Sequence, residues 1–323
     1  MYYKMSWQIT VGRYLLAMLD SCEIHKSVDL LADTCTITLP GYAHNEVSKI
    51  DKVRVEEKIK RGDKVIVMLG YDGKLLKEFE GYLLNINTDD GNMTLNCEDD
   101  LFLLRKPVAN KQFKNSSVKA IAQYIVDQTG TMKLTINCTL TVDYDKFVIS
   151  MATAYDVLKK LQEETSANIY LLNGTLHIHP PYIKIFGLVR YSFQRNIEQS
   201  SLKYKTKEDR KVQIVIEGVG RDGKKIEITS GTTGGDRITK KASGQSLSAM
   251  KALADAEYLK NVFDGYEGDI TTWLIPYVEP AYSAEVNDED FKEKNGRYYV
   301  KSVTTTFDSS GAARKVQLGI KTG

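Results

Sequence analysis

Cysteine is scarce in this sequence, and none of it is arranged as a Cys-x-x-Cys pair. Cys22, Cys35, Cys97 and Cys138 are far apart along the 323-residue chain, so neither a zinc site nor a redox dithiol is indicated. Cys35 and Cys97 fall in phase with the apolar positions of alternating segments. This pattern favours buried, reduced thiols in a protein made in a cytoplasm.

The sequence also lacks long apolar runs and a strong excess of charge. No stretch approaches the roughly 18 apolar residues of a membrane span, and Met1-Tyr2-Tyr3-Lys4 does not begin a signal peptide. The 44 basic and 42 acidic residues leave a formal net charge of +2, which indicates no broad surface for nucleic acid. We therefore expect a soluble globular chain without stable membrane insertion, without recognition of a specific nucleic-acid sequence and without export by the usual secretory route.

No pattern in the sequence predicts an active site, a cofactor site or a metal site. His177 and His179 share a strand face, but no third metal ligand lies at a suitable spacing, so a solvent-facing hairpin pair is favoured. Neighbouring residues of Glu98-Asp99-Asp100 would point to opposite faces of a strand, whereas a general acid and base must converge on a substrate. Asn287-Asp288-Glu289-Asp290 lacks the spaced oxygen ligands of a calcium loop. We expect no enzymatic activity.

Two glycine-rich stretches resemble nucleotide-binding loops only in part. Gly218-Val219-Gly220 is followed by the turn Asp222-Gly223 and a second strand, where a dinucleotide-binding motif would begin a helix. Gly231-Thr232-Thr233-Gly234-Gly235 lacks the Gly-Lys-Ser/Thr ending of a phosphate-binding loop. A hairpin and a polar loop are therefore the favoured interpretations.

The stretch from Arg61 to Ile86 begins with the adhesion-like tripeptide Arg61-Gly62-Asp63, yet its pattern predicts scaffold. An apolar run of strand length follows from Val65 to Leu69, Tyr71-Asp72-Gly73 offers turn chemistry, and alternation resumes from Tyr82. The tripeptide then forms the turn into a strand whose apolar side chains enter a core.

Residues 1–105 carry the period-2 pattern of β-structure. In segments 34–39 and 93–98, polar and apolar residues alternate, which is typical of half-buried strands. Gly-containing turns at Asp72-Gly73 and Asp89-Asp90-Gly91-Asn92 separate the strands. Short strands joined by tight turns predict a small antiparallel β-barrel.

Residues 106–187 combine two helical patterns with a hairpin signal. Ser117, together with the serine before it, can cap a helix that Gly130 would end. A second amphipathic helix is expected over 153–165, with its charged side chains mostly on the outer face. Asn173-Gly174 between two apolar runs is a strong hairpin signal. The segment predicts a small α/β domain.

Residues 188–323 return to β character and predict a second β-barrel domain. The segment 231–246 has few apolar residues, so we expect a mobile polar loop there. A helix is expected over 247–261, before the final group of strands.

An internal repeat relates the two β-rich parts. Segments 81–95 and 296–318 each contain a strand, a Gly-containing turn and a strand. The sequence therefore predicts a mainly β fold with an α+β insertion, in which two related small antiparallel β-barrel domains flank a small α/β domain. The positions assigned to its turns and core strands are Gly62, Asp63, Val65, Val67, Leu69, Asp72, Gly73, Gly81, Tyr82, Gly296, Tyr298, Tyr299, Val316 and Leu318.

This order of domains resembles a known family. RGDKVIVMLGYDG followed by FEGYLLNI, and the terminal NGRYYVKSVTTTFDSSGAARKVQLG, resemble strands of the baseplate hub proteins of contractile phage tails, the late control protein D family. AMKALADAEYLKNVFDGYEGDITTW resembles the helix that leads into the last strands of that family. Similar hub modules occur in type VI secretion spikes and other contractile injection systems.

The resemblance implies a virion structural protein without a cofactor. The implied assembly is a homotrimer whose two barrels per chain make a six-fold-like ring between the tail tube protein and a separate spike protein. Other baseplate proteins are further partners, and the implied location is the virion tail baseplate of a phage or prophage, after synthesis in the bacterial host cytoplasm. A tail-associated hub of a non-contractile phage tail is the alternative, and a cell-wall hydrolase using Glu98 or Asp99 is a more distant one.

Overall fold

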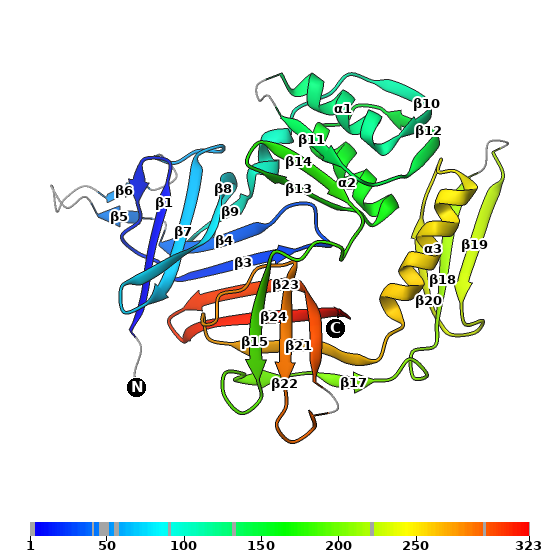
Figure 1. Ribbon diagram of the computed structural model, residues 1–323. Coiled ribbons are helices and arrows are strands. Elements are labelled where there is room, and N and C mark those ends of the chain that lie inside the picture. The colour runs from blue at the N-terminus through cyan, green and yellow to red at the C-terminus, as the bar shows by residue number, and fades with distance from the viewer. Residues whose placement is uncertain are drawn as a thin grey trace.

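The computed structural model describes residues 4–40, 42–44, 52–54, 58–89, 92–130, 134–219, 223–292 and 295–322 (Figure 1). Its strands far outnumber its helices, and the helices gather in the middle and late parts of the chain. The predicted mainly β fold with a small α/β insertion is confirmed. The turn residues expected at positions 90 and 91, and those expected at positions 220 and 222, lie outside the described residues.

The N-terminal β-domain is built from antiparallel strands with alternating burial. In β7 every second side chain from Val65 is buried, and this strand lies between β1 and β8, so that Val67 pairs with Ile9 on one side and Phe79 on the other. Alternate side chains of a strand face the same side of the sheet, which creates one apolar face. The strands are β1 (Met5–Val11), β2 (Tyr14–Leu15), β3 (Ser21–Ser27), β4 (Thr34–Pro40), β5 (Tyr42–His44), β6 (Lys52–Arg54), β7 (Lys64–Tyr71), β8 (Lys74–Asp89) and β9 (Asn92–Glu98).

The middle α/β domain follows local sequence signals closely. The hydroxyl of Ser117 accepts a hydrogen bond from the amide of Ala120, and Gly130 ends the helix in the left-handed conformation. Thr153 and Asp156 form a reciprocal capping box at the second helix, so both predicted helices are confirmed. The elements are a 3₁₀ helix η2 (Asp100–Leu104), β10 (Lys111–Ser117), α1 (Val118–Thr129), β11 (Thr135–Cys138), β12 (Asp143–Ile149), α2 (Ala154–Thr165), β13 (Asn168–Leu172) and β14 (Thr175–His179).

The C-terminal β-domain ends in a long antiparallel hairpin. Its strands are β15 (Gly187–Ser192), β16 (Gln199–Ser200), β17 (Lys203–Lys205), β21 (Gly265–Thr272), β22 (Tyr282–Asn287), β23 (Gly296–Asp308) and β24 (Gly311–Lys321). The β23–β24 hairpin and the β8–β9 hairpin both contain register shifts. Both segments of the internal repeat therefore fold as irregular antiparallel hairpins.

One continuous sheet joins the two β-domains. Its strand order is β16-β21-β24-β23-β3-β4-β9-β8-β7-β1-β2, with β15, β17 and β22 attached beside this path. The joint is the antiparallel pairing of β23 with β3, which runs over seven residue pairs from Ser302 and Ser27 to Asp308 and Ser21. Among the described strands the path is open at both ends. The sheet thus connects domains that the middle α/β segment separates in sequence.

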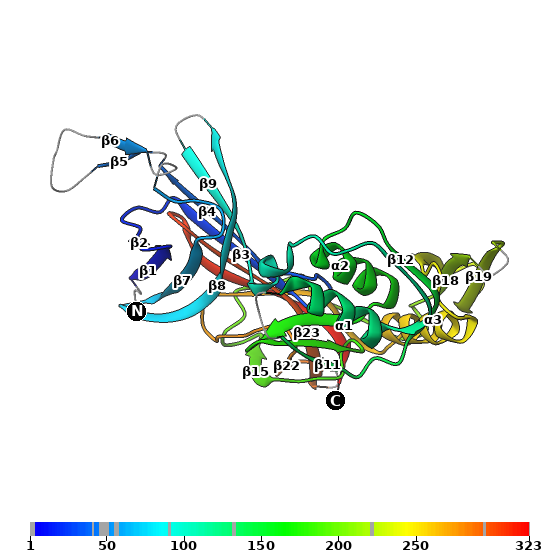
Figure 2. The same cartoon turned by 90° about the horizontal axis from the view of Figure 1, so that it is seen from above.

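A small three-stranded unit is inserted into the C-terminal domain. It consists of β18 (Val212–Val219), β19 (Lys225–Gly231), β20 (Asp236–Lys241) and α3 (Leu247–Asn261), and Figure 2 shows it at the opposite end of the molecule from β5 and β6. The helix lies where the sequence predicted it. Its side chains Met250 and Ala254 pack on the β18 residues Ile214 and Ile216, which form a core separate from that of the neighbouring strands.

The prediction of a mobile loop over 231–246 was wrong. The segment contains β20, which pairs in parallel with β18 from Asp236 to Lys241. Its single large apolar residue, Ile238, packs against the core beneath α3. Backbone pairing with the apolar strand β18 stabilises β20 despite its polar composition. The residue pattern of the segment itself cannot predict this pairing.

Candidate interaction surfaces

The adhesion-like tripeptide Arg61-Gly62-Asp63 forms part of the turn that leads into β7. One carboxylate oxygen of Asp63 accepts a hydrogen bond from the Lys60 amide at 2.9 Å, and the Asp63 carbonyl accepts one from the Leu83 amide at 2.9 Å. Gly62 has φ of +90°, a conformation that glycine adopts without strain. The guanidinium of Arg61 lies 5.4 Å from the ring centre of Phe102. Arg61 and Asp63 therefore contact neighbouring parts of the same chain, and Gly62 provides the backbone geometry of the turn.

The other predicted turn and core positions of the first domain lie around the β7–β8 hairpin. Val65, Val67 and Leu69 are buried, and Asp72 and Gly73 form its turn with φ of 52° and 76°. Gly81 lies so close to β9 that a Cβ atom there would be 2.1 Å from the Glu98 carbonyl oxygen. Tyr82 stacks on Phe102 with ring centres 5.6 Å apart.

The predicted positions of the last domain lie on the β23–β24 hairpin. Gly296 begins β23, while Tyr298, Tyr299, Val316 and Leu318 are buried. The phenol oxygen of Tyr298 accepts a hydrogen bond from the Tyr266 amide at 3.2 Å. These side chains therefore hold neighbouring strands of the C-terminal domain together.

A buried ion pair connects the two β-domains, and sequence reasoning missed it. Arg314 on β24 is fully buried and donates to Glu78 on β8 at 2.6 Å and to the Pro276 carbonyl at 2.8 Å. Burial raises the pKa of Glu78 even though Arg314 opposes this shift. Arg314 and the buried Val316 are two positions apart on β24 and therefore face the same side of the sheet. A charged residue in phase with apolar ones was the feature of the sequence that could have indicated a buried ion pair.

The segment after β21 also crosses the seam between the β-domains. Leu274 belongs to the apolar core of the N-terminal domain, although the chain around it belongs to the C-terminal one. Lys26 on β3 donates to both carboxylate oxygens of Glu279, at 2.7 and 2.9 Å, and the hydroxyl of Tyr277 also donates to Glu279. Apolar and ionic contacts therefore fix the two domains relative to each other.

The carboxylate cluster of the sequence is structural. Glu98 ends β9 and forms a bidentate pair with Arg105 at 2.5 and 2.6 Å. Asp99 caps the 3₁₀ helix by accepting from the Leu101 amide at 2.9 Å, and its other oxygen accepts from the Asp33 amide at 3.0 Å. These carboxylates hold the junction between strand and helix, and they do not converge across a gap.

A cavity of about 270 Å³ lies where all three domains meet. Asp33 and Asp99 line it, together with Glu279 and apolar residues such as Leu172 and Phe186. Burial raises the pKa of the Asp33 carboxyl above its usual range, and burial followed by the charge of Asp33 raises the pKa of Asp99. Lys26 opposes the shift at Asp33, whereas Glu279 adds to it.

The charged residues of the second helix mostly face outward as expected, and Glu164 is the exception. Glu164 is buried and accepts a hydrogen bond from the Tyr144 hydroxyl at 2.9 Å. Burial raises its pKa to about 7. The helical pattern placed Glu164 beside exposed residues, but α2 is covered on that side by the loop after β20, where Gln245 donates to the Glu164 carbonyl.

We expect the protein to become more stable as the pH falls from about 8 to about 6.5. Burial raises the pKa of Asp99 to about 8 and that of Glu164 to about 7, so the folded chain binds more protons than the unfolded chain in this window, whereas the lowered pKa values of His177 and His179 oppose the effect only at lower pH. The midpoint of thermal unfolding across this range measures the effect. Glu164→Gln keeps an acceptor for Tyr144 and should flatten the slope near pH 7, whereas a midpoint that falls on acidification would contradict the assignment.

The two strand histidines do not form a solvent-facing pair, because His179 is buried. Its Nδ1 lies 2.9 Å from the Pro180 carbonyl and its Nε2 lies 3.3 Å from the Tyr170 hydroxyl, while His177 stacks on the same tyrosine ring. Within the described ranges, no group of three or more His, Cys, Asp or Glu side chains is placed to hold a metal ion.

No helix in the described part of the chain is both long enough and apolar enough to cross a membrane. No protein-family model matches the sequence, and no curated protein sequence does.

Solved structures resemble the chain over its whole length. A tail protein from Neisseria meningitidis aligns with a TM-score of 0.64 at 12% identity, covering 98% of this chain and 97% of that one. The 43 kDa tail protein of prophage MuSo2 from Shewanella oneidensis aligns with a TM-score of 0.63 at 16% identity, covering 98% of both chains. The fold is that of phage tail proteins.

A secretion protein shares this tail-protein fold. A component of the type VI secretion system of E. coli, described as structurally similar to the T4 phage tail proteins gp27 and gp5, aligns with a TM-score of 0.59 at 10% identity. The alignment covers 99% of this chain and 77% of that one. The resemblance to hub proteins of contractile tails and type VI secretion spikes, predicted from the sequence, is thus confirmed in the fold.

Proposed function

We propose that this chain is a structural hub of a phage or prophage tail baseplate. The observation that carries the proposal is the full-length likeness to two tail proteins of similar chain length, at TM-scores above 0.6. The type VI secretion component with the same fold supports a place in a contractile machine. The tail tube protein, a separate spike protein and other baseplate proteins are the partners of this hub, and the virion tail is its location.

The hub acts as a homotrimer. Two β-domains that each contain an irregular hairpin are joined edge to edge through β3 and β23, so three copies supply six similar β-domains. Six similar domains match a six-fold tube, whereas three chains match a three-fold spike. The seam of Arg314, Glu78 and Leu274 supports this role because it fixes the angle between the two domains of one chain.

An exposed apolar segment is the surface that neighbouring copies cover in this trimer. Ile183, Ile185, Phe186 and Leu188 lie within six residues, and about half or more of each side chain is exposed. The segment continues into β15. Among the described strands, β15 pairs only with β22, so its other edge is open. An apolar run beside an open strand edge is typical of an interface between chains.

Native mass spectrometry and light scattering are expected to report three times the 36.4 kDa chain mass. Ile183→Glu places a charge on a side chain that is 65% exposed, so it should leave the fold intact and shift the population to monomer. The control Leu259→Glu, on the exposed side of α3, should keep the trimer. A strictly monomeric protein at high concentration would count against the hub.

The hub of a non-contractile tail remains the second candidate, since the solved tail proteins share the fold. Sheath, tube and spike proteins encoded beside this chain would separate the contractile from the non-contractile hub. The hydrolase alternative gains no support from the geometry, because Glu98 is paired with Arg105 and Asp99 caps a helix. We propose a non-enzymatic role.

A further inference from the structure

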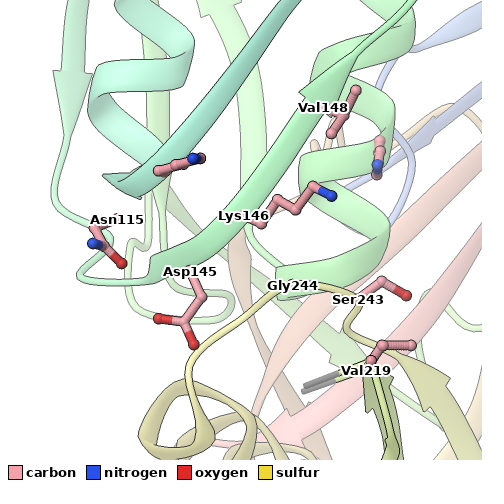
Figure 3. A pocket seen from close by; sticks show the side chains of 10 residues that line it. Asn115, Asp145, Lys146, Val148, Val219, Ser243 and Gly244 are labelled. Carbon is pink, nitrogen blue, oxygen red and sulfur yellow. The ribbon is translucent and has the colours of Figure 1, made fainter. Parts of the chain in front are cut away.

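A groove of about 560 Å³ separates the middle α/β domain from the inserted three-stranded unit. Figure 3 shows Lys146 and Val148 on one wall, and Val219, Ser243 and Gly244 on the segments opposite. The Gly244 carbonyl accepts hydrogen bonds from the amides of Asp145 and Lys146 at 2.7 and 3.2 Å, which fixes the floor of the groove. One wall of the groove belongs to the middle domain and the other to the inserted unit, and each of these has its own apolar core.

Two lysines in this groove lie directly opposite each other in the β10–β12 ladder. Lys114 pairs with Lys146 in register, and both side chains are exposed. Directly opposed residues in an antiparallel pair have their Cβ atoms about 5 Å apart, and like charges at this position are destabilising. Neither ammonium group forms an ion pair with a residue in the described ranges. The fold thus maintains a repulsion that an anion in the groove would relieve.

A third lysine adds to the positive charge. Lys160 on α2 lines the groove, with its ammonium group 4.7 Å from the ring centre of Phe147. The nearby carboxyl of Glu164 has its pKa raised to about 7 by burial, so near neutrality it offsets only part of this charge. Asp145 is the one acidic side chain among the described lining residues. The groove is therefore positive overall.

The rest of the lining is apolar or backbone. Val148 and Val219 are each nearly half exposed, and Gly223, Ser243 and Gly244 bring main chain to the surface. Asn115, in the same lining, has φ of 48°, in the left-handed region that asparagine adopts more readily than most residues. Positive charge beside exposed apolar side chains suits a ligand that carries both acidic and apolar groups.

We propose that this groove binds an acidic, partly apolar segment of a partner protein. Carboxylates of the segment lie between Lys114, Lys146 and Lys160, and its apolar side chains contact the two valines. Nucleic acid fits less well, because the described lining contains neither arginine nor an aromatic ring on which a base could stack. The site is independent of the proposed trimer, since the apolar segment 183–188 does not line the groove.

Fluorescence anisotropy with a labelled peptide of alternating glutamate and valine tests the site on the full chain. Binding should weaken as salt is added, and Lys114→Glu with Lys146→Glu should weaken it by about tenfold or more. The matched control Lys203→Glu with Lys251→Glu makes the same charge change at exposed positions outside the groove. This control should leave binding unchanged within about twofold.

The thermal midpoint gives a second readout that does not depend on the probe. Lys146→Glu alone converts the opposed lysines into an ion pair with Lys114, so it should raise the midpoint by about 1–2 °C while it weakens peptide binding. Equal weakening by both double variants, or equal binding of a glutamine and valine peptide, would overturn the proposal. Tighter binding of single-stranded DNA than of the acidic peptide, or equally strong binding of inorganic phosphate, would also overturn it.

Discussion

Replacing Arg314 with alanine is expected to lower the free energy of unfolding by about 3–5 kcal/mol. The guanidinium is fully buried and bridges Glu78 of the other β-domain to the backbone carbonyls of Leu274 and Pro276. Without it, the carboxylate of Glu78 and both carbonyls lose their buried hydrogen-bond partner. Urea unfolding of the variant and of the parent protein measures the loss.

The pH dependence of this loss identifies its cause. Burial already raises the pKa of Glu78, and removal of Arg314 raises it further, so a protonated and neutral Glu78 is easier to bury at acidic pH. The destabilisation should therefore be smaller at acidic pH than at alkaline pH. A loss that is independent of pH would point to packing alone.

A double variant provides the matched control. Arg314→Met with Glu78→Leu removes both charges and fills similar volume, so it should recover most of the stability that Arg314→Ala loses. If the double variant is as unstable as the sum of the two single changes, the pair does not act as a unit. In that case, the seam depends on the carbonyl contacts of Arg314 instead.

Local signals predicted the parts of the fold that local physics determines. The cap at Ser117, the stop at Gly130 and the Asn173-Gly174 hairpin all form as expected, because each depends on side chains and backbone angles within a few residues. The inserted helix over 247–261 was also predicted, although its charged and apolar residues are not cleanly segregated.

The rest depends on contacts that are distant in sequence. Glu78 is turned inward by a register shift in β8, where Val67 pairs with Phe79 but Met68 pairs with Lys77, leaving Glu78 unmatched. A bulge of this kind has no sequence signature, so the partner of Arg314 could not be named in advance. The pairing of β20 with β18 and the burial of Glu164 likewise arise only when separate units pack together.

The lysine groove also lay beyond sequence reasoning. Its lining comes from β10, β12, α2 and the loops around β18 and β20, which are spread over more than one hundred residues. The strand alternation of 111–117 and 143–149 contains the opposed lysines, but their register becomes visible only when β10 and β12 are paired. The charge composition did not indicate a positively charged groove, because the net charge of the whole chain is only +2.

Val67→Asp is expected to unfold the N-terminal β-domain. Val67 is fully buried in β7, where it pairs with Ile9 of β1 and Phe79 of β8 and belongs to the apolar core of the domain. The change removes about 1.5–3 kcal/mol of apolar burial and places a carboxyl group in the core without a partner. Because β3 of this domain pairs with β23 of the C-terminal domain, loss of the N-terminal domain should also abolish assembly of the trimer.

Asp63→Glu is the matched variant, since it destroys the adhesion tripeptide but keeps its charge. The longer side chain can still reach the Lys60 amide, and the Asp63 carbonyl that Leu83 contacts is unchanged, so the expected loss is at most about 1 kcal/mol. Thermal melts and native mass of both variants separate the two interpretations of this stretch. A stable, trimeric Val67→Asp protein would refute the core position of β7, and loss of binding to a cell-surface receptor in Asp63→Glu alone would show that the tripeptide is a ligand.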